Sequence, residues 1–155
     1  MAAEQTKGIH MTNIYRTLFS KLKISVVVAL AACSVAQADD VTESDRMLCS
    51  LSQLMLCVED GLCFPVSVLD VDIPQFLVID LKKKTITPTE ASSDDRVSEV
   101  TNIARDNGRT FLQGVENDGA YSILIEDDLG HFTGSIARDG ITVSVFGACT
   151  DADIH

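Results

Sequence analysis

The residue types that most often do chemistry gather around one predicted hairpin turn. Glu126, Asp127, Asp128 and His131 lie there together, and carboxylates with an imidazole are ligands for divalent cations. Their spacing does not match the calcium loop of an EF-hand, and acids on a tight turn are more often simply solvated. We therefore name these four residues as the candidates for metal binding, but we predict no bound metal and no cofactor.

Serine hydroxyls near a histidine are a second possible chemistry. Ser122, Ser135 and Ser144 alternate with apolar residues, and His131 is the one internal histidine after residue 38. However, the sequence has no G-x-S-x-G elbow and no glycine-rich phosphate loop, and hydroxyls at alternate positions are ordinary on a sheet surface. We predict a non-enzymatic protein, with a small hydrolase using His131 and nearby carboxylates as an alternative.

Cysteine is the third reactive residue type, and its pattern here predicts structural disulfides. Cys49, Cys57, Cys63 and Cys149 lack both the C-x-x-C spacing of a redox site and a histidine at zinc-finger distance. An even set of cysteines in an exported chain predicts two disulfides, and four cysteines allow three pairings. The Asp-Gly turn between Cys57 and Cys63 favours that pair across a hairpin, which would leave Cys49 to pair with Cys149.

The N-terminal region predicts export. A stretch with four basic residues precedes a short apolar run at residues 24–32, and Ala36 and Ala38 follow as an A-x-A cleavage site. This order is typical of a bacterial signal peptide, here residues 1–38, and the apolar run is too short for a comfortable transmembrane helix. Met11 in place of Met1 would give a leader of more ordinary length.

A lipoprotein signal is the alternative interpretation of the same region. Leu30-Ala31-Ala32-Cys33 resembles a lipobox, in which Cys33 would be lipidated after removal of residues 1–32. The first interpretation predicts a periplasmic or secreted protein, and the second predicts a lipid anchor in the bacterial envelope. In both cases, contact with a membrane is expected only through the signal peptide or the lipid.

Composition limits the possible partners. The chain has 155 residues with 12 basic and 23 acidic side chains, a net charge of -11. Without residues 1–38, eight basic and 22 acidic residues remain, a net charge of -14. So few clustered cations exclude a nucleic-acid partner, and the many large apolar residues exclude intrinsic disorder. We expect the partner to be a basic protein or a small ligand.

The remaining chain, residues 39–155, is predicted to be a single all-β domain. Four short turn-forming segments rich in Asp, Asn and Gly end in Gly108, Gly119, Gly130 and Gly140. Their regular spacing is typical of strands joined by tight hairpins. We expect an antiparallel meander of about eight to ten short strands, closed as a small barrel or folded as a sandwich, after an N-terminal signal helix. The predicted strands are 47–52, 54–58, 62–66, 76–80, 85–87, 97–104, 110–115, 121–125, 132–136 and 141–146.

Alternation of apolar and polar residues predicts which side chains face the core of this domain. They are Tyr121, Ile123, Ile125, Phe132, Ile136, Ile141, Val143 and Val145. Glycines inside strands, at positions 114, 134 and 147, predict a bend, a bulge or a close crossing. The segment 88–96 is predicted to be a surface loop, and residues 82–84 a lysine-rich hairpin turn.

From Leu48 to Thr150 the sequence resembles small exported bacterial proteins that carry no assigned activity. The likeness lies in Cys49, Cys57 and Cys63, in Ile79-Asp80-Leu81, in Gln113-Gly114-Val115-Glu116 and in the closing Phe146-Gly147-Ala148-Cys149-Thr150. This resemblance implies export and a compact disulfide-bonded β-domain.

A fold-level similarity to C-type lysozyme inhibitors is the other resemblance. Those proteins are small exported β-barrels that hold a basic enzyme through a barrel loop, which would suit an acidic chain. Their S-G-x-x-Y loop motif is missing, and Gly119-Ala120-Tyr121 is not an adequate substitute. A lysozyme-inhibitor-like function is therefore an alternative, carried by analogy of fold.

Overall fold

The computed structural model describes residues 39–116 and 119–153, which belong to one compact unit, Gln37–His155. The predicted signal helix, with Cys33, Ala36 and Ala38, lies outside the described residues. All regular secondary structure in the described residues is β-strand, so the prediction of an all-β domain is confirmed, and none of them belongs to a helix that could cross a membrane. The strands are β1 (Arg46–Val58), β2 (Cys63–Val66), β3 (Phe76–Asp80), β4 (Thr85–Pro88), β5 (Ser98–Glu99), β6 (Asn102–Asp106), β7 (Arg109–Glu116), β8 (Gly119–Glu126), β9 (His131–Arg138) and β10 (Ile141–Asp151).

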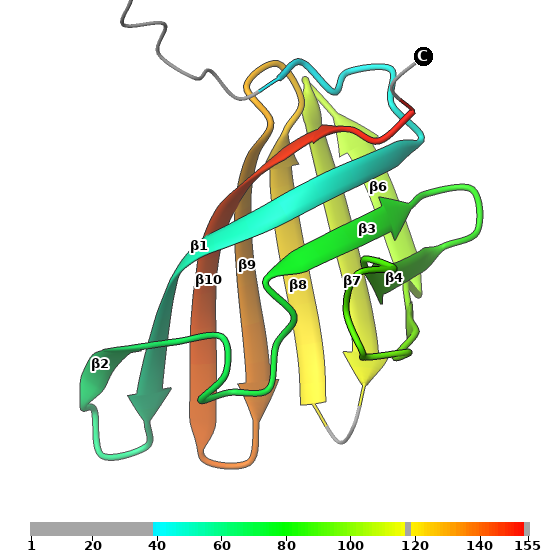
Figure 1. The fold of residues 1–155 in the computed structure, drawn as a ribbon. Helices are drawn as coiled ribbons and strands as arrows, with labels where there is room; N and C mark the ends of the chain where they lie inside the picture. Colours follow the sequence, from blue (N-terminus) through cyan, green and yellow to red (C-terminus); the bar gives the residue numbers. More distant parts are fainter. Residues whose placement is uncertain (1–38, 117–118, 154–155) are drawn as a thin grey trace, which may run out of the picture. The chain divides into compact units, whose positions relative to one another are not determined.

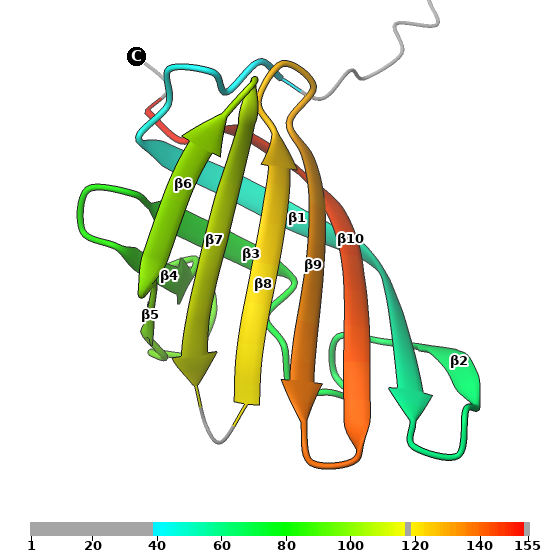
Figure 2. The same cartoon turned by 180° about the vertical axis from the view of Figure 1, so that it is seen from behind.

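These ten strands form one antiparallel sheet that curls into a half-barrel (Figures 1 and 2). The order is β5-β4-β3-β1-β10-β9-β8-β7-β6, and β2 pairs with β1 beside it. Strands β6 to β10 are a meander, as predicted, and left-handed glycines lie in three of the tight turns, at Gly108, Gly130 and Gly140.

The first two predicted strands are a single long strand, which corrects the prediction of separate strands at 47–52 and 54–58. Strand β1 pairs with β10 over its whole length, and the register shifts between Leu51 and Gln53. A bulge of this kind bends a strand and increases its twist. At Gly147 on β10 an added Cβ would overlap the carbonyl of Ser50, so the two strands approach closely beside the bulge.

The predicted strand 97–104 is wrong as a single element, because the chain changes partners within it. Ser98–Glu99 pairs with β4, whereas Asn102–Asp106 pairs with β7. Between them, the Val100 amide donates to the Lys84 carbonyl and the Thr101 amide donates to the Gln113 carbonyl. The segment 98–106 therefore links the two opposite ends of the strand order, so the single sheet closes toward a barrel and does not split into a sandwich.

Inward-facing side chains fill most of the half-barrel. Ile123, Ile125, Phe132, Val143 and Val145 are buried as predicted, whereas Tyr121, Ile136 and Ile141 are only half-buried. The three half-buried residues all lie near the end of the sheet that holds the β9–β10 turn. The inside of the sheet is therefore packed toward one end and incompletely filled toward the other.

The packed end is covered by the segment that precedes β1. Val41 is 1% exposed, and its amide donates to the carbonyl of Asp127 at 2.7 Å. Arg105 donates to the carbonyl of Ser44 at 2.6 Å, and the Ser44 hydroxyl donates to Asp151 at 2.8 Å. These bonds join the segment to β6 and β10. The segment therefore covers one end of the half-barrel, and we call the opposite end the open end.

Candidate functional site

The predicted serine and histidine candidates lie on the outer face of the sheet and do not form a catalytic pair. Ser122 is opposite Ser135, which is opposite Ser144, so the three serines make one row across β8, β9 and β10. His131 is on the same strand as Ser135 but four residues earlier, a separation of roughly 13 Å along an extended strand. The imidazole is therefore out of hydrogen-bonding reach of that hydroxyl, and its Nδ1 instead lies 3.2 Å from the Glu126 carboxylate.

The four metal candidates also separate in space. The side chains of Glu126 and His131 pair with each other at the exposed surface, and Asp128 is exposed on the turn. Asp127 is 4% exposed, and its carboxylate accepts a hydrogen bond of 2.8 Å from the buried Thr110 hydroxyl. Within residues 39–116 and 119–153, no three side chains of histidine, cysteine, aspartate or glutamate are grouped so that they could hold a metal ion.

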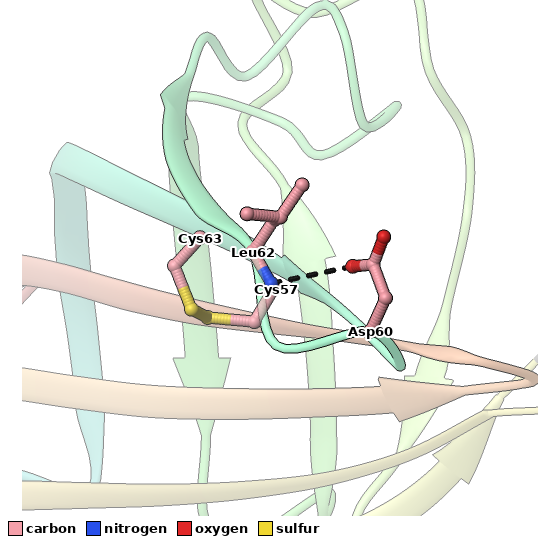
Figure 3. Close-up of a disulfide and its surroundings, with 4 residues drawn as sticks. All are labelled: Cys57, Asp60, Leu62 and Cys63. Carbon is pink, nitrogen blue, oxygen red and sulfur yellow. Dashed lines mark hydrogen bonds between the residues drawn. A yellow bond between two sulfur atoms is a disulfide. The ribbon is translucent and has the colours of Figure 1, made fainter.

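Both disulfides have the pairing that the hairpin argument favoured. Cys57 and Cys63 lie opposite each other in the β1–β2 register and are bonded, with the Leu62 amide donating to Asp60 in the turn (Figure 3). Cys49 and Cys149 lie opposite each other in the β1–β10 register and are bonded across 100 residues of chain. The second bridge is buried in the core, and both bridges are compatible with an oxidising, extracellular compartment.

A hollow with an apolar floor lies inside the half-barrel at its open end. Its volume is about 90 Å³, and its walls come from β1, β3, β4, β8, β9 and β10. The floor consists of buried apolar side chains at inward-facing positions of their strands. These floor residues are Leu51, Leu77, Ile86, Ile123, Phe132 and Val145.

A second, shallower hollow adjoins the first one. Its volume is about 260 Å³, and Ile73, Ile136 and Arg138 line both hollows. The loop of residues 67–75, between β2 and β3, forms one side, and the inner faces of β9 and β10 form the other. The second hollow is close to the lower limit of small-ligand sites, about 300 Å³, and the first hollow is smaller.

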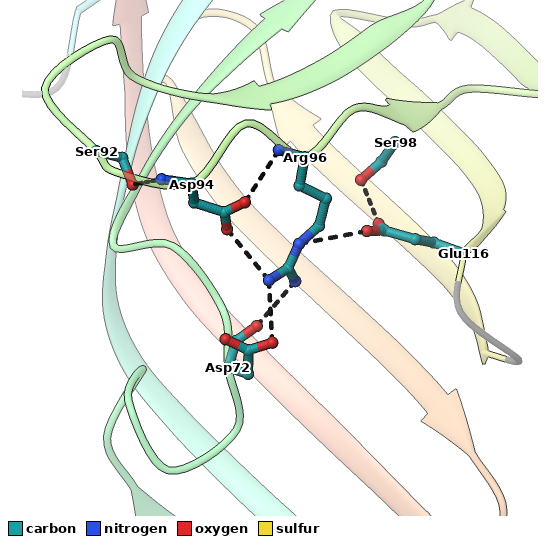
Figure 4. Close-up of polar contacts among 6 residues, drawn as sticks. All are labelled: Asp72, Ser92, Asp94, Arg96, Ser98 and Glu116. Carbon is teal, nitrogen blue, oxygen red and sulfur yellow. Dashed lines mark hydrogen bonds and ion pairs between the residues drawn. The ribbon is translucent and has the colours of Figure 1, made fainter.

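Arg96 ties together the loops at the rim of the first hollow. Its guanidinium lies 3.0 Å from Asp72 on one loop, 3.1 Å from Asp94 on the next loop and 3.7 Å from Glu116 at the end of β7 (Figure 4). It also donates to the Asp72 carbonyl at 2.9 Å, and Glu116 accepts a hydrogen bond from Ser98. One cation thus fixes both loops, and its charge is fully offset by the carboxylates around it.

Tyr121 is the rim residue that reaches from β8 across to β5. Its hydroxyl donates to the Glu99 carbonyl at 2.7 Å, and the ring stands directly opposite Gly114. Burial, with the nearby Glu116 charge, raises the pKa of Tyr121 to about 12, so the phenol stays neutral at ordinary pH. The hydroxyl proton is thus donated within the fold.

Alternation assigned Tyr121 to the core, but sequence reasoning did not single out the charged residues of this rim. Arg96 was part of a predicted surface loop, and its ion pairs depend on a fold that brings residues 72, 94 and 116 together. One signal was present for Arg138, which follows Phe132, Gly134 and Ile136 at inward positions of β9. When the next inward-facing position of a strand holds a charged residue in place of an apolar one, this change indicates an end of the barrel that is open to solvent.

Comparisons with known proteins give this site no precedent. No protein-family model matches the chain, and neither the curated proteins nor the solved structures contain a match.

Proposed function

We propose that this chain is an exported, non-enzymatic binding protein that takes a small, largely apolar ligand at the open end of its half-barrel. The observation that carries the proposal is the pair of adjoining hollows with an apolar floor and a rim of a few polar side chains. Concave, mostly apolar pockets with few convergent polar groups are the usual form of small-ligand sites.

The arrangement of the candidate catalytic groups favours binding over catalysis. His131 and Glu126 are paired on the outer face, whereas the hollows open on the inner face of the sheet. A general base must come within about 3 Å of the proton that it removes. A ligand held in the hollows would be separated from His131 by the thickness of the sheet.

The proposed location is the periplasm or the exterior of the cell. Two disulfides are compatible with an oxidising compartment, and the basic-then-apolar N-terminal sequence supplies the expected export signal. The proposed binding function requires no cofactor or nucleotide, and the sequence has no phosphate-binding loop.

A neutral fluorescent probe tests the proposed function. N-phenylnaphthylamine brightens in apolar sites, so the purified protein, in the form that the cell produces, should enhance its emission saturably. Ile136→Trp should abolish this signal, because Ile136 lines both hollows and a larger side chain would fill them.

The matched control is Ala137→Trp, the next residue on β9, which is exposed on the outer face. This variant should bind the probe as the parent does, and thermal unfolding should show that both variants fold. Equal probe binding by the parent and by folded Ile136→Trp would show that the hollows are not the site.

A further inference from the structure

Arg138 is the charged residue of the open end that the fold leaves without a carboxylate. It lines both hollows, and no described residue forms an ion pair with it. By contrast, the other two charged residues of the first hollow, Arg96 and Glu116, pair with each other. Arg138 is exposed, and its place beside both hollows distinguishes it from Arg109, which also forms no ion pair within the described residues.

The fold also fixes where the Arg138 side chain lies. An added Cβ at Gly119, on the neighbouring strand β8, would come within 2.8 Å of the Arg138 Cγ. The aliphatic part of the arginine therefore lies directly over Gly119, where any other residue would displace it. Such packing holds the stem against the sheet while the guanidinium reaches the solvent at the rim.

The surroundings of Arg138 combine an apolar floor with one available cation. Phe132, Ile123 and Val145 form the deep part of the first hollow, and Ile141 and Val143 continue the apolar surface in the second hollow. Asp72 is already bound by Arg96. Asp70, which also lines the second hollow, accepts hydrogen bonds from the amide and the hydroxyl of Ser67 at 2.9 and 2.7 Å.

We propose that the ligand is an amphipathic molecule with a single anionic head group, and that Arg138 is the residue that recognises this group. This inference rests on the proposed function, because it assigns the polar end of a ligand whose apolar part would occupy the hollows. A guanidinium presents a planar fork of donors that fits a carboxylate in a bidentate manner. The acidic residues that line the hollows, Asp70, Asp72 and Glu116, already bond to Ser67 or Arg96, and more distant charges are screened beyond about 8 Å at physiological ionic strength.

Competition with three amphiphiles of equal chain length tests the inference. Octanoate, octanol and octyltrimethylammonium should all displace N-phenylnaphthylamine from the protein as the cell produces it, and octanoate should do so at about tenfold lower concentration than octanol. Arg138→Gln should remove this preference and leave displacement by octanol unchanged, and Arg138→Lys should retain part of it.

The control variant is Arg109→Gln, because Arg109 is exposed on β7 and, within the described residues, likewise forms no ion pair. It should keep the preference for octanoate. Equal displacement by all three amphiphiles, or the tightest displacement by octyltrimethylammonium, would overturn the role of Arg138 while the proposed function stands. Absence of probe binding by the parent protein would instead overturn the proposed function itself.

Discussion

Gly114 is a residue that the open end of the barrel requires, because its missing side chain makes room for a tyrosine. It stands opposite Tyr121, and an added Cβ would overlap both the Tyr121 ring and the carbonyl of Glu99. The tyrosine hydroxyl bonds to that same carbonyl, so ring, carbonyl and glycine form one tightly packed unit. The close approach expected from a glycine inside a strand is thus confirmed here.

Replacing Gly114 with alanine should therefore destabilise the protein. Overpacking of a well-packed site typically costs about 1–3 kcal/mol of unfolding free energy, and here the overlapping carbonyl belongs to the backbone, which yields less than a side chain. Urea denaturation measures this loss. Val115→Ala, at the next and outward-facing position of β7, should change the unfolding free energy by less than about 0.5 kcal/mol. Equal stability of the two variants would contradict the packing argument.

Tyr121 should titrate late and should make the fold sensitive to alkaline pH. The pKa of its phenol is raised from 10.0 to about 12, mainly by burial, so the folded state keeps its proton where the unfolded chain has lost it. The resulting stability is fully present below pH 10 and is lost as the pH rises through 12.

Ultraviolet absorbance of the tyrosinate measures this titration directly. The chain has two tyrosines and no tryptophan, and Tyr15 lies in the predicted signal peptide, so a chain that begins at Asp39 has Tyr121 as its one tyrosine. Tyr121→Phe should abolish the absorbance change and reduce the loss of stability between pH 10 and 12. A midpoint near 10 in the folded protein would mean that the phenol is solvated.

At the scale of elements, the two disulfides should contribute unequally to stability. The Cys49–Cys149 bridge closes a separation of 100 residues between β1 and β10, whereas Cys57–Cys63 closes a separation of six within one hairpin. In the chain-entropy model these loops correspond to about 4–5 and about 2 kcal/mol of unfolding free energy, respectively.

Paired substitutions separate the two contributions. Cys49→Ala with Cys149→Ala should lower the urea midpoint more than Cys57→Ser with Cys63→Ser. The first pair also removes buried sulfur from the core, which acts in the same direction, and the second pair lies in a half-exposed hairpin. A larger loss from the hairpin pair would show that this bridge does more than close a short loop.

Sequence patterns predicted the strands well where each strand is straight and ends in a glycine turn. Strands β7, β8 and β9 follow this rule, since local alternation and turn chemistry decide both their faces and their ends. The end of β10 was predicted at residue 146, but this strand runs to Asp151. The other errors fall on β1 and on the β5–β6 segment, where the chain bends or changes partners. A bend of this kind depends on long-range pairing, which alternation within one segment does not reveal.

The candidate site was harder to predict for a related reason. Its apolar floor uses residues that alternation assigned to the core, such as Phe132 and Val145, but alternation does not say where a core is incompletely filled. Its rim depends on Arg96 meeting Asp72 and Glu116 from two other segments. Pairs as distant as these follow from the curl of the sheet, and no local pattern encodes them.

At the scale of the whole described domain, the two ends of the half-barrel differ in how they are closed. The segment Asp39–Asp45 covers one end, with Val41 in the core and the Asp39 carboxylate accepting a hydrogen bond of 3.0 Å from Thr150. The other end keeps the two hollows and their rim. Asp39 is also the first residue after the predicted A-x-A site, so cleavage there would keep Asp39, Val41 and Ser44 in the chain.

The contacts of this segment lead to a prediction about processing. Cleavage after Ala38 would preserve every contact of Val41 and Ser44, whereas a cut a few residues later would remove a buried valine and uncover the core. Intact-mass measurement of the protein from the cell should therefore give a chain that begins at Asp39. A diacylglycerol adduct on Cys33 would contradict cleavage after Ala38 and would establish the lipid-anchored form. The Val41→Ala variant should keep the same N-terminus, because cleavage depends on the sequence of the leader. It should unfold at a lower urea concentration, because stability depends on the packing at the covered end of the barrel.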